Sequence, residues 1–290
     1  MSYSQIFSGS RNELAAFFVF TEIDSSSTHS RDLIFPMKKL SLAILISALI
    51  GTSAHGFTVV TGSVSNFSGP DDLLLDPSTS VVAVDSFGSN GSLVVNGVTF
   101  QSDAATGSVT AGGATVATVA TNTIDGWGTP PAYTGTDPAS TDNLELIMHD
   151  IRWSAVPANV TIDISGLNPG TNYNVQLLFS ENISANDRHW DIAVDGALAV
   201  DDYNTNGTTN TVASVYEGTF DPGADGILNI IMGANPLPGD PNNTGPGPRP
   251  PQDHNPIIHA IIVHEVIPEP SGLALMGIGL GALVLRRRRS

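Results

Sequence analysis

The stretch Tyr173-Asn174-Val175-Gln176-Leu177-Leu178-Phe179 decides the fold class. Its odd-numbered positions are apolar or aromatic, whereas Asn174 and Gln176 are polar, and this period of two is typical of a β-strand. The same alternation occurs in residues 159–164 and 190–195. Trp190 shares its parity with the apolar residues of the latter segment, so we expect the indole to point into a core.

Turn signals separate the strands. Asn96-Gly97 and Asp195-Gly196 each stand between apolar runs, and both turn positions in such pairs tolerate the positive φ that a tight hairpin needs. Further strand-like runs occupy residues 212–220, 226–232 and 257–266. No convincing helix lies between any of the strands from residue 91 to residue 266. The pattern therefore predicts an all-β protein, a jelly-roll-like β-sandwich over residues 57–266.

Composition excludes several classes of function. The chain has no cysteine, which removes disulfides, thiolate metal sites and cysteine nucleophiles. It has 28 acidic and 11 basic residues, a formal net charge of −17, and only Arg152, Arg188 and Arg249 are basic between Phe57 and Pro268. Nucleic-acid binding is not expected, because neutralising phosphates needs Lys and Arg. The acidic surface suits a solvated extracellular setting, and solubility alone also explains it.

The N-terminal region predicts export. Lys38 and Lys39 precede the apolar run 40–50, and small residues follow it, so residues 37–56 have the organisation of a secretory signal peptide with a helical apolar region. A signal peptide belongs at the start of a chain, and Met37 would therefore be the true start. Residues 1–36 are then a mis-annotated or disordered leader.

The C-terminal region, residues 267–290, contains three elements in a fixed order. These are Pro268-Glu269-Pro270, an uncharged segment at 272–285, and the basic tail Arg286, Arg287, Arg288 and Arg289. The order closely resembles the PEP-CTERM sorting signal. That resemblance implies recognition by an exosortase-type membrane protease, removal of the tail, and release or attachment at a bacterial surface rich in exopolysaccharide; a plain C-terminal anchor is the alternative.

The physical chemistry of this tail agrees with transient membrane insertion. Residues 272–285 would form a short transmembrane helix of about 21 Å, less than the ~30 Å of a hydrocarbon core. The four arginines would stay on the cytoplasmic side. The two prolines would keep the Pro268-Glu269-Pro270 element extended at the outer interface.

The body from about Asn143 to Val266 also resembles malectin-like and galactose-binding-like jelly rolls. The resemblance rests on 164–171 leading into the Tyr173 strand, on 188–196, and on 225–230. It implies a fold that often binds carbohydrate, but fold does not establish function. The aromatic ligand residues of malectin have no counterpart on this chain, so no site is transferred from it.

Metal sites and catalytic motifs receive little support. Asp221 and Asp225 are spaced like part of a calcium loop but lack a middle ligand and a bidentate glutamate, so a tight turn is the better interpretation and structural calcium has no support. His254, His259 and His264 alternate faces along a strand and cannot converge on zinc. Catalytic motifs for hydrolases and phosphate loops are absent. Glu145, Glu181 and Glu217 could form a glycosidase pair only if the fold brought two together.

Two loops carry the remaining predictions. The Gly- and Pro-rich loop 125–138 holds Trp127 and Tyr133, which we expect to form an exposed aromatic platform for a sugar, with Trp153 beside Arg152 as a second choice. The Pro-rich loop 235–256 is either a partner contact or a tolerated insertion. We therefore predict an exported, non-enzymatic surface or biofilm-matrix protein that binds exopolysaccharide or another glycan. The alternatives are a structural or adhesive matrix protein and a glycan-acting enzyme.

Overall fold

The computed structural model describes residues 62–103, 107–182, 188–205, 207–233, 237 and 254–267. The leader, the signal peptide and the sorting signal beyond Ile267 lie outside these residues, as does most of the Pro-rich loop 235–256. The described residues therefore make up most of the predicted β-sandwich body.

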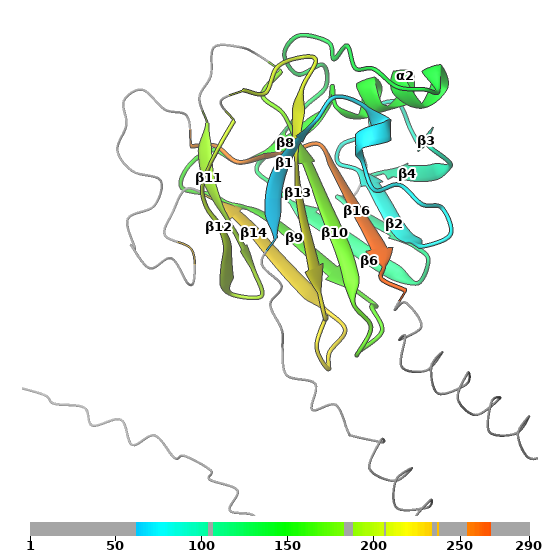
Figure 1. The fold of residues 1–290 in the computed structure, drawn as a ribbon. Coiled ribbons are helices and arrows are strands. Elements are labelled where there is room, and N and C mark those ends of the chain that lie inside the picture. The colour runs from blue at the N-terminus through cyan, green and yellow to red at the C-terminus, as the bar shows by residue number, and fades with distance from the viewer. Residues whose placement is uncertain are drawn as a thin grey trace, which may run out of the picture. The chain divides into compact units, whose positions relative to one another are not determined.

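Strands dominate this part of the chain (Figure 1). They are β1 Ser63–Phe67, β2 Ser80–Asp85, β3 Leu93–Val95, β4 Val98–Ser102, β5 Ser108–Ala111, β6 Ala114–Val119, β7 Asn122–Ile124, β8 Ile151–Trp153, β9 Val160–Ser165, β10 Tyr173–Phe179, β11 His189–Val194, β12 Ala197–Asn204, β13 Ala213–Phe220, β14 Leu228–Gly233, β15 Ile257–Ile258 and β16 Ala260–Glu265. A 3₁₀ turn, η1, covers Pro70–Asp72, and an α-helix, α2, covers Pro138–Ile147.

The strands form two large sheets and a small one. A seven-stranded sheet has the order β1-β13-β10-β16-β2-β4-β3, and a six-stranded sheet has the order β12-β11-β14-β9-β6-β5. Most neighbours are antiparallel, while β2 and β4 are parallel. The small sheet, β15-β8-β7, contributes Ile151, Ile257 and Ile258 to the core between the two large sheets. The predicted all-β sandwich is confirmed.

The main core lies between the large sheets. The alternating residues Val175 and Leu177 of β10 meet Ile162 and Ile164 of β9, and all are fully buried. Trp190 of β11 has no exposed surface and packs edge-on against Phe179, so its predicted inward orientation is confirmed. Burying side chains of this size contributes about 1.5–3 kcal/mol each.

Both predicted hairpins are present. Val95 pairs with Val98 across Asn96 and Gly97, whose φ angles are 48° and 80°. Asp195 and Gly196 have φ angles of 47° and 77° and connect β11 to β12. These are the left-handed conformations that Asn, Asp and Gly adopt at least cost.

The expectation of no helix is wrong, because α2 lies over the outer face of the seven-stranded sheet. Its N-cap is Asp137, whose carboxylate accepts a hydrogen bond from the Ser140 N–H, and Pro138 occupies the first helical position. Leu144 and Ile147 are fully buried in a second hydrophobic cluster with residues of β1, β4, β10 and β16. This cluster covers one end of the sheet's outer face.

Candidate functional site

Trp127 lies in the loop between β7 and α2, and backbone contacts anchor that loop. The Trp127 N–H donates to the His149 carbonyl at 2.6 Å, the Gly126 N–H to Asp150 Oδ1 at 3.3 Å, and the Thr129 N–H to the Asn182 carbonyl at 3.0 Å. The indole is half-buried and packs against the main core. The loop therefore presents Trp127 in a defined position.

A buried ion pair lies against this indole. The Arg188 guanidinium carbon stands 5.2 Å from the centroid of the Trp127 ring, within the range of a cation–π contact. Arg188 Nε is 2.6 Å from Glu181 Oε2, and Nη1 donates to the Asn255 carbonyl at 3.2 Å. Arg188 and Glu181 are both buried, so the pair is held in one geometry beside the ring.

The structure does not form the aromatic platform as predicted. Tyr133 is only 6% exposed, with its ring 5.8 Å from Phe67 in the cluster beneath α2, so the expected exposure of Tyr133 is wrong. Its position follows from the Ala132 and Thr134 N–H groups, which donate to the Asn210 and Ser68 carbonyls and draw the segment onto the sheet. Trp153 is half-buried against the main core. Trp127 remains the predicted platform with Trp153 as second choice, and their roles in binding remain predictions.

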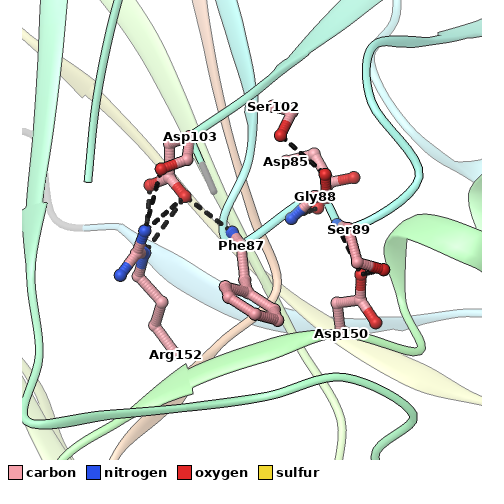
Figure 2. A network of polar contacts seen from close by, with 8 residues as sticks. All are labelled: Asp85, Phe87, Gly88, Ser89, Ser102, Asp103, Asp150 and Arg152. Carbon is pink, nitrogen blue, oxygen red and sulfur yellow. Dashed lines mark hydrogen bonds and ion pairs between the residues drawn. The ribbon is translucent and has the colours of Figure 1, made fainter. Parts of the chain in front are cut away.

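Three buried carboxylates support the loop that follows β2 (Figure 2). We call Asp85, Asp103 and Asp150 the carboxylate cluster. The consecutive N–H groups of Phe87, Gly88 and Ser89 donate to Asp103, Asp85 and Asp150, at 2.7, 3.1 and 2.9 Å respectively. Because Asp150 also accepts from Gly126, it joins this loop to the Trp127 loop.

The cluster has more negative than positive charge. Arg152 makes a bidentate ion pair with Asp103, in which Arg152 Nη2 lies 2.7 Å from Asp103 Oδ1. Among the residues that the structure describes, Arg152 is the basic residue paired with the cluster. Asp85 is fully buried, and its Oδ2 has no hydrogen-bond partner. Burial, together with the nearby charges of Asp150 and Asp103, raises the pKa of Asp85 to about 8. Asp85 therefore keeps its proton at neutral pH.

The residues considered for metal binding or hydrolysis have separate structural contacts. Asp221 and Asp225 accept hydrogen bonds from the Gly223 and Ile227 N–H groups, as expected for a tight turn. The three histidines contact different groups: His254 the His189 carbonyl, His259 the Ser180 carbonyl, and His264 the Ser80 hydroxyl.

The glutamates considered for a glycosidase pair, Glu145, Glu181 and Glu217, each contact a different partner. Glu145 accepts from the Tyr133 N–H, Glu181 pairs with Arg188, and Glu217 accepts from two amide side chains of β10.

Sequence reasoning gave Asp201-Asp202 less support as a metal site than Asp221 and Asp225, and it did not place Asp191 beside them. Carboxylate oxygens of Asp191, Asp201 and Asp202 lie within 4.8 Å of one another, and the Asp202 N–H donates to Asp191 Oδ1 at 2.9 Å. A register irregularity between β11 and β12 brings them together, which no local pattern signals. Exposed acidic groups are common without an ion, so the arrangement alone establishes no metal site.

Comparison with protein families gives one match, at the C-terminus. Residues 266–289 carry a PEP-CTERM protein-sorting motif. The match contains Pro268, Glu269 and Pro270 and the tail Arg286–Arg289, so the predicted sorting signal is confirmed, although these residues lie outside the described part. The PEP-CTERM motif indicates an exported protein bound for the cell envelope or surface, and it implies recognition by an exosortase.

In the part of the chain that the structure describes, no helix is long and apolar enough to cross a bilayer. The predicted short transmembrane helix at 272–285 falls outside them.

Solved structures resemble the body only distantly. The ANX2 ectodomain from Arabidopsis thaliana has a TM-score of 0.45 and 13% identity over 65% of this chain. This chain spans about half of that one, 50% by length. A beta-glucuronidase from Bacteroides uniformis has a TM-score of 0.38 and 10% identity, covering 64% of this chain and 18% of its own. No curated protein matches the chain.

Proposed function

We propose that this PEP-CTERM protein is a non-enzymatic glycan-binding protein of the bacterial surface or exopolysaccharide matrix. Its tail would be removed by an exosortase near Pro268-Glu269-Pro270. The sorting motif supports the route to the surface, and the surroundings of Trp127 support glycan binding.

The arrangement at Trp127 suits a sugar for a physical reason. A pyranose has an apolar C–H face, which stacks on an aromatic ring, and hydroxyl edges, which need charged or polar partners at fixed positions. Trp127 supplies the ring, and the Arg188 guanidinium, which is paired with Glu181, stands over one face of it. A platform that is already held in place loses little conformational entropy when a ligand binds.

The observation that carries the proposal is the position of the Arg188 guanidinium over the Trp127 ring at 5.2 Å. These residues are far apart in sequence, and the ion pair with Glu181 holds the guanidinium in place. An indole that served only to close the end of the sandwich would not need a buried cation on its face, because apolar neighbours would suffice.

Affinity electrophoresis in the organism's own exopolysaccharide tests the proposal. We expect the exported protein, isolated from the producing cells, to be retarded by the polymer and Trp127→Ala to lose most of that retardation. Trp127→Phe should keep part of it, because a smaller ring still stacks. Val119→Ala, which shortens a side chain that is 62% exposed on β6, is the matched control.

Three outcomes would count against the proposal. Retardation that is equal for the unaltered protein and for Trp127→Ala would remove this site. Unaltered mobility of the parent protein in the polymer would remove glycan binding for that polymer and favour a structural or adhesive matrix protein. Hydrolysis of the polymer by the purified protein would contradict the non-enzymatic assignment.

A further inference from the structure

The carboxylate cluster holds the segment 86–89, which follows β2, in a strained conformation (Figure 2). Phe87 has a φ of 117°, a value that residues with a bulky side chain rarely adopt. Such a conformation costs free energy and persists only where neighbouring contacts enforce it. Here the Phe87 N–H donates to Asp103 Oδ1 at 2.7 Å, and the Ser89 N–H and hydroxyl donate to Asp150 Oδ2 at 2.9 and 2.7 Å. The segment therefore stays closed because buried carboxylates hold it.

Asp150 connects this segment to the Trp127 loop. Its Oδ2 accepts both hydrogen bonds from Ser89, while its Oδ1 accepts the Gly126 N–H at 3.3 Å. The next N–H along the chain, that of Trp127, donates to the carbonyl of His149, the residue before Asp150. A displacement of Asp150 would therefore withdraw support from the Trp127 loop.

The charged and titratable groups around Asp85 come from four places in the fold. They are Asp103 after β4, His149 and Asp150 before β8, Arg152 in β8, and His259 between β15 and β16. Burial lowers the pKa of His259 to about 4, so this ring is neutral at pH 7. Arg152 is paired with Asp103, and the other arginine that the structure describes, Arg188, is paired with Glu181. An ionised Asp85 would thus lie beside Asp150 without an arginine to balance it.

The proton on Asp85 favours the closed form of segment 86–89. Asp85 is fully buried and accepts the Gly88 N–H of this segment at 3.1 Å, so water reaches its carboxyl group when the segment lifts. In the closed form, burial and the charge of Asp150 raise the pKa of Asp85 to about 8, whereas in water it returns to about 3.9. The closed form is therefore most stable below pH 4, loses stability as the pH rises, and changes no further above about pH 8.

We propose that the carboxylate cluster is a proton-dependent latch on the Trp127 loop, so that this site binds its glycan more weakly as the pH rises. In acid, neutral Asp85 lets segment 86–89 stay closed, and Asp150 keeps its donors on both loops. At higher pH the strained segment opens more often, Asp150 loses the two Ser89 bonds, and the indole loses its fixed position. The glycan rests on the proposed function, whereas the latch rests on the hydrogen bonds and charges of the cluster.

Affinity electrophoresis in the organism's own exopolysaccharide at pH 5, 7 and 8.5 tests the effect on binding. The apparent affinity is proportional to the fraction of protein whose site is formed, so we expect the apparent dissociation constant to rise at least about threefold from pH 5 to pH 8.5. Asp85→Asn cannot ionise, and its dissociation constant should stay within about 1.5-fold over the same range.

Two control variants separate Asp85 from other titratable groups. Asp142→Asn removes an exposed carboxylate on α2 and should keep the pH dependence of the parent protein. His149→Gln removes the titratable side chain next to Asp150 and should keep it as well. Because the same polymer is used for every variant, any titration of the polymer itself affects all of them equally.

Amide hydrogen exchange tests the latch without a glycan. The Gly126 and Trp127 N–H groups should lose protection as the pH rises from 5 to 8, after division by the exchange rate of an unstructured chain. Because opening releases one proton, the loss amounts to at most about tenfold per pH unit. The N–H groups of β10 should stay more strongly protected at every pH, since the opening is local. Should Asp85→Asn fail to fold, exchange in the parent protein still decides.

The outcomes separate this inference from the proposed function. Binding that Trp127→Ala abolishes but that is equal at pH 5 and pH 8.5 overturns the latch and leaves the glycan site intact. A pH dependence that persists in Asp85→Asn and disappears in His149→Gln also overturns it. Absence of binding at every pH removes the proposed function, and constant protection of Gly126 and Trp127 would then overturn the latch independently.

Discussion

Replacing Asp85 by Asn should stabilise the protein at neutral pH. Asp85 is fully buried within the carboxylate cluster and stays protonated in the folded state, since its pKa lies at about 8. An Asn side chain reproduces this neutral form: its Oδ1 can accept from the Gly88 N–H as Asp85 Oδ1 does, and its NH₂ takes the place of the protonated oxygen. The variant therefore changes mainly the unfolded state.

The magnitude follows from proton linkage. In the unfolded chain Asp85 ionises with a pKa of about 3.9, roughly three units below pH 7. Release of its proton at pH 7 therefore favours the unfolded state by about 4 kcal/mol. Because folding raises the pKa of this carboxyl group, the contribution of Asp85 to stability is greatest below pH 4. That contribution falls as the pH rises and levels off above about pH 8. Asp85→Asn removes this loss. Allowing for relaxation around the site, we expect a gain of about 2–4 kcal/mol at pH 7 and about 1 kcal/mol at pH 5.

Urea unfolding at pH 5, 7 and 8, followed by tryptophan fluorescence, measures this gain. Asp142→Asn, an exposed carboxylate on α2, serves as the control and should change the free energy of unfolding by less than about 0.5 kcal/mol. The reasoning is refuted if the difference between Asp85→Asn and the parent does not grow from pH 5 to pH 7. That result would mean that Asp85 is already ionised in the folded protein.

Three further predictions concern other contacts. Arg152→Met should lower the free energy of unfolding by about 3–5 kcal/mol in urea titrations, because it leaves the Asp103 carboxylate buried without its partner; adding Asp103→Asn should recover part of the loss, and no recovery would contradict the pairing argument. Gly97→Ala should cost about 1–2 kcal/mol, since φ is +80° there, and an unchanged urea midpoint would count against a left-handed turn. Glu269→Ala should leave an uncleaved protein in the membrane fraction on immunoblots, whereas normal release would disprove processing at this motif.

Local patterns predicted the strands and turns well. The Asn96-Gly97 and Asp195-Gly196 hairpins depend only on the conformational preferences of two adjacent residues, so the sequence contains all the information needed. Helix α2 also left a local signal, Asp137 followed by Pro138, but few of its residues are apolar, and buried Ser140 and Thr141 hide its period. A cap without a strong apolar stripe is easily overlooked.

The site could be predicted only in part, because its contacts are long-range. The loop around Trp127 was identified from composition, but the Arg188 guanidinium on its ring comes from a different part of the chain. Tyr133 has the same local context as Trp127, yet the sheet partner Phe67 decides its burial. Alternation predicted that Asn174 and Gln176 share a face, whereas their burial depends on the neighbouring strands β13 and β16.

The central place of β16 has a mechanical consequence. This strand ends at Glu265, immediately before the sorting motif, and it pairs with β10 on one side and β2 on the other. Tension on the C-terminal segment would run along the axis of β16, perpendicular to the hydrogen bonds on both of its sides. These hydrogen bonds would therefore be loaded in shear and all together. An edge strand such as β1 could peel away bond by bond. Traction on the chain end that remains after removal of the tail would thus enter the body at a strand that resists unfolding.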